Sequence, residues 1–297
     1  MKNTLPLVSI ITINYNHLEL TQALLKSLES ISYPNTEIIV VDNNSDVNPK
    51  SILLKEYPYI KVIVSDTNLG FAGGNNLGIK EAKGKYLLFI NNDTEVEPNF
   101  LEPLADKLES NPKIGMVSPK IIYYGTDLIQ YAGATNINKY TGRGRKIGHA
   151  EKDIGQYNKD RRTALAHGAA MMIPAHVIDI AGMMPELYFL YYEEHDWCEI
   201  IKRAGFEIHY VANSTIYHKE SMSIGINSPF KTYYMTRNRI LFMRRNTSGI
   251  SLFIGYIFFM VFAFPKNTLT FLVRRQHDHL KAYLKGIAWN FQKSNVS

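Results

Sequence analysis

The strongest clue to the fold is a series of short apolar segments that each end in polar residues. The clearest is Tyr86-Leu87-Leu88-Phe89-Ile90, which leads directly into Asn91-Asn92-Asp93. The same arrangement occurs at residues 7–13, 36–41 and 60–64, which are followed by Asn14 and Asn16, by Asp42, Asn43 and Asn44, and by Asp66 and Asn68. Apolar runs bounded by turn residues are typical of buried strands. The series predicts a sheet whose polar side chains gather at one edge, where α/β proteins place ligands.

Helical patterns separate these strands. Apolar residues recur at helical spacing in residues 17–30, and shorter helices are expected near 49–57 and 75–82. Another helix is expected to start at Pro98, because proline is favoured in a first turn. Residues 114–118 predict a fifth strand. This alternation predicts an α/β fold with a mostly parallel central sheet and helices on both faces.

The rest of the chain follows a different pattern. Residues 119–166 are rich in Gly, Tyr, Asn and basic residues, and we expect a long excursion or lid there. Residues 167–219 again predict regular elements: an apolar stretch at 169–173, helices at 175–181 and 193–204, and strands at 206–211 and 214–217. Gly205 stands where a helix C-cap glycine belongs. We therefore expect one α/β domain over residues 1–245.

Residues 246–297 form a basic and apolar helical tail that follows a basic helix at 233–245. Residues 249–264 are almost wholly apolar, but a spanning helix needs about 20 such residues. Apolar character resumes at 269–273, with Arg244-Arg245 and Arg274-Arg275 on the two sides. Two interpretations stay open: an anchor on an anionic membrane surface, or core helices that pair with another subunit.

Composition narrows the classes of partner. The 297-residue chain has a formal charge of +6, which suits nucleic acid, an anionic membrane or a phosphorylated ligand. The basic residues cluster near the apolar tail without an aromatic-basic stripe, so we expect no nucleic-acid partner. Cys198 is the only cysteine and is expected to be a small buried hydrophobe. The N-terminus leads directly into a strand, so we expect no signal peptide.

Three polar motifs are candidates for ligand binding. Asp93 can hold Mg²⁺ or Mn²⁺ against a diphosphate, although Asn and Asp also simply satisfy their own turns. Asp42 can accept from a base imide or a ribose hydroxyl, or serve as a cap. The glycine-rich segment 68–76 allows close backbone approach and precedes a helix N-terminus, or it is only a turn. Its spacing matches neither the dinucleotide fingerprint nor the P-loop.

An acidic cluster is the candidate for proton transfer. Acidic residues at a helix start, as in Glu193-Glu194-His195-Asp196-Trp197, are stabilised by the helix dipole and need no other function. Its carboxylates nevertheless follow a tyrosine-rich run and include a candidate base for an acceptor hydroxyl. His218 gains a role only if Asp93 binds a metal.

Together these motifs resemble family 2 glycosyltransferases of GT-A fold, particularly bacterial rhamnosyltransferase-like enzymes of cell-surface polysaccharide assembly. The similarity covers residues 6–245. Residues 8–16 and 40–45 look like the family's first two strands, and residues 68–76 resemble its Asn-x-Gly segment. Asn91-Asn92-Asp93 stands at the DxD-type metal motif, and residues 193–197 stand at the motif that supplies the base.

The resemblance implies a metal-dependent, inverting transfer of a sugar such as rhamnose. The donor would be a nucleotide-diphosphate sugar, and the acceptor a growing cell-surface glycan, expected to be lipid-linked. Asp93 and His218 would hold the metal, and Glu194 or Asp196 would be the base. Implied donor-binding residues are Thr12, Asn14, Asn16, Asp42, Asn68, Gly70, Asn75, Asn91 and Asn92. We expect a peripheral or monotopic protein on the cytoplasmic face of the bacterial inner membrane, and a homo-oligomer is compatible with it.

The chain departs from the family pattern in places, and other functions stay open. Asn91 replaces an aspartate, Glu194 stands where aspartate is expected, and Pro174 stands where arginine is frequent. Residues 183–185 interrupt the turn expected after Gly182. One alternative is a non-catalytic, membrane-attached nucleotide-sugar binding module. Another is a sugar-nucleotide pyrophosphorylase, although its usual Gly-rich loop with Arg and Lys is missing from the first strand.

Overall fold

The computed structural model describes residues 5–219 and 228–292, and the chain divides into two compact units. The sheet unit consists of Met1–Thr135, Lys146–Phe189 and Glu193–Ser223. The helical unit consists of Asn136–Arg145, Leu190–Tyr192 and Ile224–Ser297. Helix α7 (Pro229–Asn246), which the prediction places in the α/β domain, packs against helix α10 (His277–Gln292) within the helical unit.

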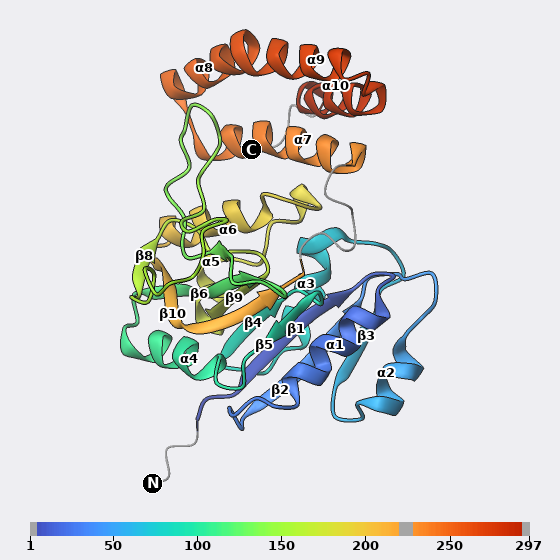
Figure 1. Cartoon of the computed structure of the whole chain (residues 1–297), viewed down its shortest axis with the longest axis vertical. Helices are drawn as coiled ribbons and strands as arrows, with labels where there is room; N and C mark the ends of the chain where they lie inside the picture. Colours follow the sequence, from blue (N-terminus) through green and yellow to red (C-terminus); the bar gives the residue numbers. More distant parts are fainter. Residues whose placement is uncertain (1–4, 220–227, 293–297) are drawn as a thin grey trace. The chain divides into compact units, whose positions relative to one another are not determined.

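The sheet unit contains a ten-stranded sheet with the main order β3-β2-β1-β4-β9-β6-β10-β5 (Figure 1). Its strands are β1 (Val8–Asn14), β2 (Thr36–Asp42), β3 (Lys61–Val64), β4 (Tyr86–Ile90), β5 (Thr94–Val96), β6 (Ile114–Tyr123), β7 (Ile129–Tyr131), β8 (Arg161–Thr163), β9 (Ala170–Pro174) and β10 (Glu207–His218). The predicted α/β class is confirmed. The parallel arrangement holds for β3-β2-β1-β4 and for β6 with β10, whereas β9 runs antiparallel between β4 and β6. A loop leads into β9, so no crossover helix imposes a parallel direction.

Helices that follow the strands complete this unit. They are α1 (Leu18–Leu28), α2 (Lys50–Glu56), α3 (Gly70–Glu81), α4 (Leu101–Ser110), α5 (Ala175–Ala181) and α6 (Glu193–Arg203), with a 3-10 turn at Glu186–Tyr188. Strand β4 is buried along its whole length, as expected of a central strand. The predicted start of α4 at Pro98 is wrong: the helix begins at Leu101, and the Pro98 carbonyl accepts hydrogen bonds from the backbone N–H and hydroxyl of Ser32.

Helix α3 starts earlier than the predicted residue 75, so most of the glycine-rich segment is helical. Its glycines allow the helix to lie directly on β1. A Cβ on Gly74 would stand 2.9 Å from Ile13 Cδ1, and one on Gly78 would stand 2.4 Å from Ile11 Cγ2. Real Cβ atoms do not approach other atoms so closely, and therefore these glycines serve helix–sheet packing.

The middle segment is more ordered than predicted. Strand β6 extends through Tyr123, and β7 and β8 lie within the predicted excursion at residues 119–166. The two predicted strands near residues 206–217 are one strand, β10, with a shift in register between Val211 and Thr215. Gly205 has a positive φ of 95° just after α6, as predicted for a C-cap glycine.

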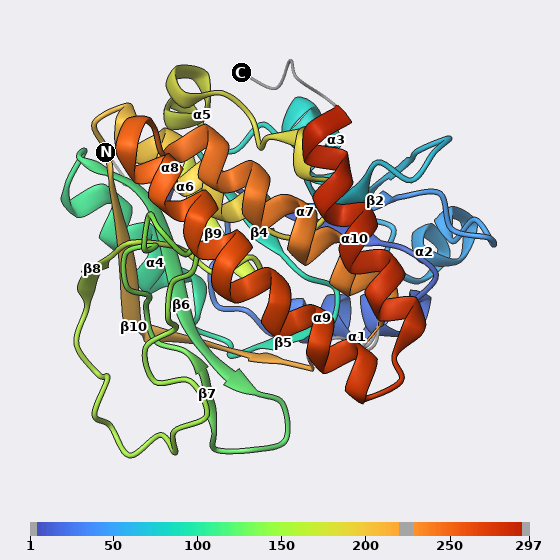
Figure 2. The same ribbon diagram turned by 90° about the horizontal axis from the view of Figure 1, so that it is seen from above.

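The helical unit contains one long apolar helix, seen from above in Figure 2. Helix α8 (Gly249–Phe258), a π-helical turn (Phe259–Ala263) and helix α9 (Phe264–Val273) form 25 continuous residues. The expectation of a segment too short to span is therefore wrong. The Phe264 N–H bonds to the Phe259 carbonyl five residues back, and this wider turn accommodates the ring of Pro265.

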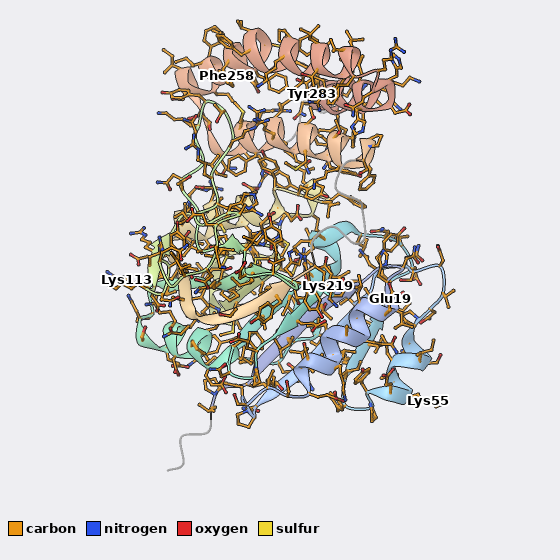
Figure 3. The ribbon with its side chains drawn as sticks, in the orientation of Figure 1. Glu19, Lys55, Lys113, Lys219, Phe258 and Tyr283 are labelled. Carbon is orange, nitrogen blue, oxygen red and sulfur yellow. The ribbon has the colours of Figure 1, made fainter. Side chains whose placement is uncertain are left out.

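This helix is long and apolar enough to cross a membrane by length and composition. Its best 18-residue window has a mean hydropathy of 1.7 and is 11% buried within the structure. Large apolar side chains such as Ile250, Phe253, Phe262 and Leu269 are exposed. The opposite side packs on Tyr283 of α10, which is labelled with Phe258 in Figure 3. The two predicted alternatives, a membrane anchor or a contact with another subunit, both apply to the exposed side of this helix.

Candidate functional site

The ends of β1 and β2 are joined by a closed network of hydrogen bonds. Asn14 and Asp42 are register partners, and Asn14 Nδ2 donates to Asp42 Oδ1 at 2.8 Å. Asn14 also donates to Ser45 Oγ and accepts from Thr21 Oγ1. Ser45 in turn donates through its backbone N–H and its hydroxyl to the Asp42 carboxylate. Asp42 is therefore held in one orientation at the sheet edge.

Two further predicted donor-binding residues border this network. Asn16 has a positive φ of 58°, and its Oδ1 accepts from the backbone N–H of Asp46 at 2.7 Å. This contact ties the loop after β1 to the loop after β2. Thr12 is fully buried inside β1, and its hydroxyl has no hydrogen-bond partner among the described residues.

The start of α3 is fastened to the end of β2 through Asn43. Its Nδ2 donates to Asn68 Oδ1 and to the Gly70 carbonyl, and its Oδ1 accepts from the Leu69 N–H. The predicted residues Asn68 and Gly70 thus lie beside Asp42. Asn75 is buried inside the helix and donates to the Phe71 carbonyl of its own helix. Asn43 was missing from the predicted site, although its place directly after Asp42 was a usable signal.

The turn after β4 is also partly fixed by internal bonds. The Asn91 N–H donates to the Ala169 carbonyl at 3.0 Å, which links this turn to the segment before β9. Asn92 is buried and donates to Thr21 Oγ1 at 3.0 Å, so its side chain faces α1. The predicted donor-binding role of these two asparagines stays a prediction.

The structure brings Asp93 and His218 together, as predicted, but without an aligned hydrogen bond between them. Strand β5 follows Asp93 and pairs with the end of β10, with Thr94 opposite His218. His218 Nε2 lies 3.0 Å from Asp93 Oδ1, and both side chains are more than nine-tenths buried. The two atoms are not aligned as a hydrogen bond, and neither has another partner among the described residues. Lys219, labelled in Figure 3, follows and pairs with Glu95.

A third residue explains the orientation of His218. His218 Nδ1 lies 2.7 Å from Gln130 Oε1, an acceptor, and in the tautomer that carries its proton on Nδ1 this contact is a hydrogen bond. In the neutral ring, Nε2 then presents a lone pair toward the Asp93 carboxylate. Gln130 lies on β7, and nothing in the sequence pattern of the excursion signalled it.

Two buried acceptors that face each other fit a cation between them. Carboxylate oxygen and imidazole nitrogen both bind divalent metals, and a hydrogen bond on the far ring nitrogen is the usual support of such a ligand. Among the described residues, no group of three or more His, Cys, Asp or Glu could hold a metal. The remaining ligands would be diphosphate oxygens and water, as is common for Mg²⁺.

Glu194 of α6 lies against the segment that leads into β9. Its Cδ atom would be 3.7 Å from a Cβ placed on Gly168, next to the Ala169 carbonyl that Asn91 contacts. Its Oε2 is buried and has no hydrogen-bond partner among the described residues, and its Oε1 is 3.8 Å from His195 Nδ1. Glu194 and the turn of Asn91-Asn92-Asp93 therefore both lie against residues 168–169.

Asp196 and Cys198 of α6 face the core. Asp196, the other candidate base, is fully buried. Cys198 is also buried, as predicted, and burial raises the pKa of its thiol to about 12, which removes it from thiolate chemistry. Burial, with Lys146 close by, lowers the pKa of His167 well below its usual range. The geometry therefore favours Glu194 as the base.

The residues that lead into α6 have strained backbones. Phe189, Tyr191 and Tyr192 have φ values of 64°, 68° and 76°, which non-glycine residues rarely adopt. Within the helical unit, Asn238 Nδ2 donates to the carbonyls of Leu190 and Tyr191 at 2.7 and 2.8 Å. Each strained residue costs about 1–3 kcal/mol, so such bonds are needed to keep the segment in place.

The fold and this site define a glycosyltransferase of GT-A type. The family model of Glycosyl transferase family 2 matches residues 9–174, more than half of the chain. The protein belongs to this family, and the predicted fold class and family are confirmed. The family also favours transfer over the pyrophosphorylase alternative.

Curated relatives and solved structures agree with this assignment. The chain is 26% identical over 270 residues to dTDP-rhamnosyl transferase RfbF of Shigella flexneri, covering 85% of this chain and 86% of that protein. It is 26% identical over 242 residues to the low-salt glycan biosynthesis hexosyltransferase Agl10 of Haloferax volcanii, covering 79% and 74%. GalNAc-T7 superposes with a TM-score of 0.65 at 16% identity, covering 82% of this chain and 48% of that one. S. aureus TarS 1-349 superposes with a TM-score of 0.57 at 16% identity, covering 94% and 80%.

Proposed function

We propose that this protein transfers rhamnose, or a related hexose, from a nucleoside-diphosphate donor to a hydroxyl of a growing, lipid-linked cell-surface glycan. The observation that carries the proposal is the buried pair of acceptors, Asp93 Oδ1 and His218 Nε2, at the end of the sheet. The rhamnosyl donor is supported by the name of the Shigella relative. A nucleoside diphosphate with a divalent metal is supported by the GalNAc-T7 complex with UDP, GalNAc and Mn²⁺.

Asp93 and His218 would hold the metal, Mg²⁺ or Mn²⁺. When bound, the ion supplies positive charge that neutralises the diphosphate leaving group. Gln130 keeps the proton on His218 Nδ1, so that Nε2 stays available as a ligand. Asp42, held by Asn14 and Ser45, presents a fixed carboxylate to the base or ribose of the donor.

Glu194 would accept the proton of the attacking acceptor hydroxyl. A general base within reach of that proton contributes about 10²–10⁴-fold to the rate. Attack from the face opposite the leaving diphosphate, in a single displacement, inverts the anomeric configuration. Glu194 carries this role because its Oε2 has no hydrogen-bond partner among the described residues, whereas Asp196 is fully buried.

The helical unit would bring the enzyme to the cytoplasmic face of the bacterial inner membrane. It carries fourteen Lys and Arg residues against a single acidic residue, Asp278. The exposed apolar side of the helix Gly249–Val273 lies in the same unit. Positive charge beside apolar surface suits an anionic bilayer, and each basic residue near it contributes about 1 kcal/mol. Pairing with a second copy is the alternative use of this surface.

The first test is nucleoside diphosphate release from dTDP-, UDP- and GDP-sugars, with Mg²⁺, with Mn²⁺ and with chelator, beside Asp93→Ala. Slow hydrolysis without acceptor is sufficient for the readout. We expect metal-dependent release from one donor, dTDP-rhamnose first, and its loss in the variant. Asp106, exposed on α4 and outside the site, provides the matched control as Asp106→Ala, which should leave release unchanged.

The other outcomes separate the alternatives. Donor binding by calorimetry without turnover, even with an added lipid-linked acceptor, would favour the non-catalytic module. Release that is equally fast in chelator would contradict the metal role of Asp93 and His218. A preference for UDP- or GDP-sugars would overturn only the rhamnosyl donor.

A further inference from the structure

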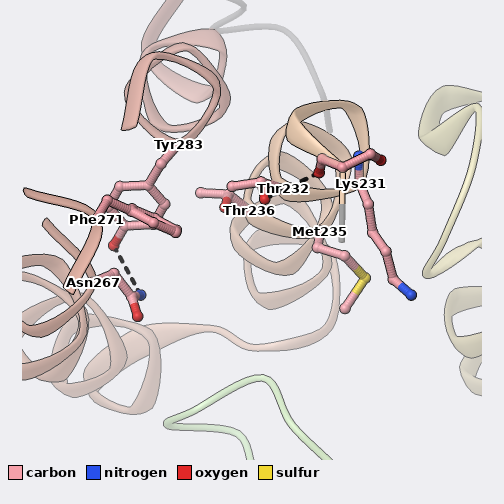
Figure 4. Close-up of a pocket in the computed structure, with 8 residues that line it drawn as sticks. Lys231, Thr232, Met235, Thr236, Asn267, Phe271 and Tyr283 are labelled. Carbon is pink, nitrogen blue, oxygen red and sulfur yellow. Dashed lines mark hydrogen bonds between the residues drawn. The ribbon is translucent and has the colours of Figure 1, made fainter. Parts of the chain in front are cut away.

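The helical unit contains a pocket of about 280 Å³ that the proposed transfer chemistry does not use (Figure 4). Thr232 and Thr236 of α7 form one wall. Asn267 and Phe271 of α9, with Tyr283 of α10, form the other wall. The close-up shows Asn267 and Tyr283 joined by a hydrogen bond, with the Asn267 amide donating to the tyrosine oxygen at 3.3 Å. The pocket is therefore lined by hydroxyl and amide groups and aromatic rings, and Ser228, Lys231 and Met235 complete its wall.

Two arginines stand at the continuation of this pocket. A smaller hollow of about 80 Å³ shares Thr236, Asn267 and Tyr283 with it and adds Arg143 and Arg239. Arg239 is only 6% exposed, its Nε donates to the Thr141 carbonyl at 2.6 Å, and its guanidinium lies 5.7 Å from the Phe259 ring. Neither arginine has a carboxylate partner among the described residues.

Two positive charges without a counter-charge indicate a site for an anion. Both side chains line the smaller hollow, and burial, with the neighbouring charge of Arg143, lowers the pKa of Arg239. Arg239 is buried and Arg143 is exposed; burying the Arg239 charge costs free energy unless it is paired, and the unit has only Asp278 as an acid. The planar donor forks of arginine match the oxygens of a phosphate in pairs.

The same helix that lines the pocket exposes an apolar surface. Asn267 and Phe271 face the pocket, whereas Leu269 and Val273 are 63% and 73% exposed. A ligand with a phosphate head and an aliphatic chain matches both surfaces. A free inorganic anion matches only the pocket.

We propose that this pocket binds the phosphate group of a lipid, with Arg143 and Arg239 on the phosphate oxygens and the aliphatic chain along the helix Gly249–Val273. This inference rests on the proposed function, because it assumes that the enzyme works at a membrane. The lipid is then recognised by its phosphate group in this pocket, in addition to the general attraction between an anionic bilayer and the basic helical unit. The lipid phosphate that carries the acceptor glycan is the ligand this chemistry describes.

The test is co-sedimentation of the full-length protein with phosphatidylcholine vesicles, with and without phosphatidic acid. The variant is Arg143→Gln, at an exposed position where folding is preserved, and the matched control is Arg274→Gln at the end of α9. Losing one general charge costs up to about fivefold in binding, whereas losing a charge-assisted phosphate contact costs about tenfold or more. We expect Arg143→Gln to lose about tenfold or more, and Arg274→Gln about fivefold or less.

The possible results distinguish the pocket, the phosphate group and the membrane. Equal losses in the two variants would overturn the pocket and leave only general charge. Phosphatidylcholine carries a phosphodiester and phosphatidic acid a phosphomonoester, so equal binding of the wild-type protein to both vesicle types would overturn recognition of an anionic phosphomonoester but keep the membrane. No binding to either would overturn the membrane part of the proposed function, while donor cleavage at Asp93 is measured separately. If free phosphate displaces the vesicles as well as soluble phosphatidic acid does, the site takes an inorganic anion and the lipid is excluded.

Discussion

The two halves of the sheet edge treat their polar side chains in opposite ways. At the ends of β1 and β2, Asn14 and Asp42 use their atoms on each other and on Ser45. At the ends of β4 and β10, Asp93 and His218 face each other as two acceptors without a hydrogen bond. A satisfied buried group supports the fold, whereas an unsatisfied one costs stability and persists where a ligand completes it. The first half therefore shapes the sheet edge, and the second half keeps the unsatisfied atoms on which the proposed metal site rests.

The largest expected effect is on the transfer rate, through Glu194, whose Oε2 is unsatisfied among the described residues, like the atoms of Asp93 and His218. Glu194→Gln removes the proton acceptor while keeping the side-chain shape, so the transfer rate should fall about 10²–10⁴-fold. Binding of the nucleoside diphosphate, measured by calorimetry, should stay unchanged. The control is Glu199→Gln on the same helix, whose carboxylate pairs only with Lys202 among the contacts described. A comparable loss in the control would show that α6 tolerates no such change, and Glu194 would lose its assignment.

A matched pair of substitutions tests the contrast through stability. Asp42→Asn weakens three hydrogen bonds to a carboxylate, each worth about 1.5–3 kcal/mol, so the free energy of unfolding should fall by several kcal/mol. Asp93→Asn removes a buried charge that has no aligned hydrogen bond on Oδ1, so the change should stay within about 1 kcal/mol. Denaturant titration of the metal-free protein measures both. Equal destabilisation would mean that the two strand ends are built alike.

A smaller effect is expected where α3 lies on β1. Gly78→Ala places a Cβ 2.4 Å from Ile11 Cγ2, and such overpacking costs about 1–3 kcal/mol. Because Asn43 contacts Asn68, just before α3, and Gly70, at its first residue, donor affinity should fall with stability. Adding Ile11→Ala should make the double variant less unstable than the sum of the two single variants. Strict additivity, measured by thermal unfolding, would show that the two residues do not compete for space.

The sequence allowed the strands, most helices and the pairing of Asp93 with His218 to be predicted, because these rest on local patterns and on family motifs. It could not show that β9 runs antiparallel, since strand direction depends on partners distant in the chain. The early start of α3 was hidden by glycines, which read as a loop although they serve packing against Ile11 and Ile13. Gln130 and the Asn238 contacts were also missed, because a hydrogen bond across about fifty or more residues leaves no periodic signal.

The strained segment before α6 has a consequence for the order in which the protein is made. The ribosome completes every strand of the sheet, as well as Glu194, before it adds Asn238. Until then, nothing offers the amide that bonds to the Leu190 and Tyr191 carbonyls. A nascent chain that ends at β10 therefore has a full sheet but lacks the bonds that hold Leu190 and Tyr191 in their strained segment. We expect a chain truncated after β10 to be cleaved faster at residues 189–192 in limited proteolysis than the complete chain.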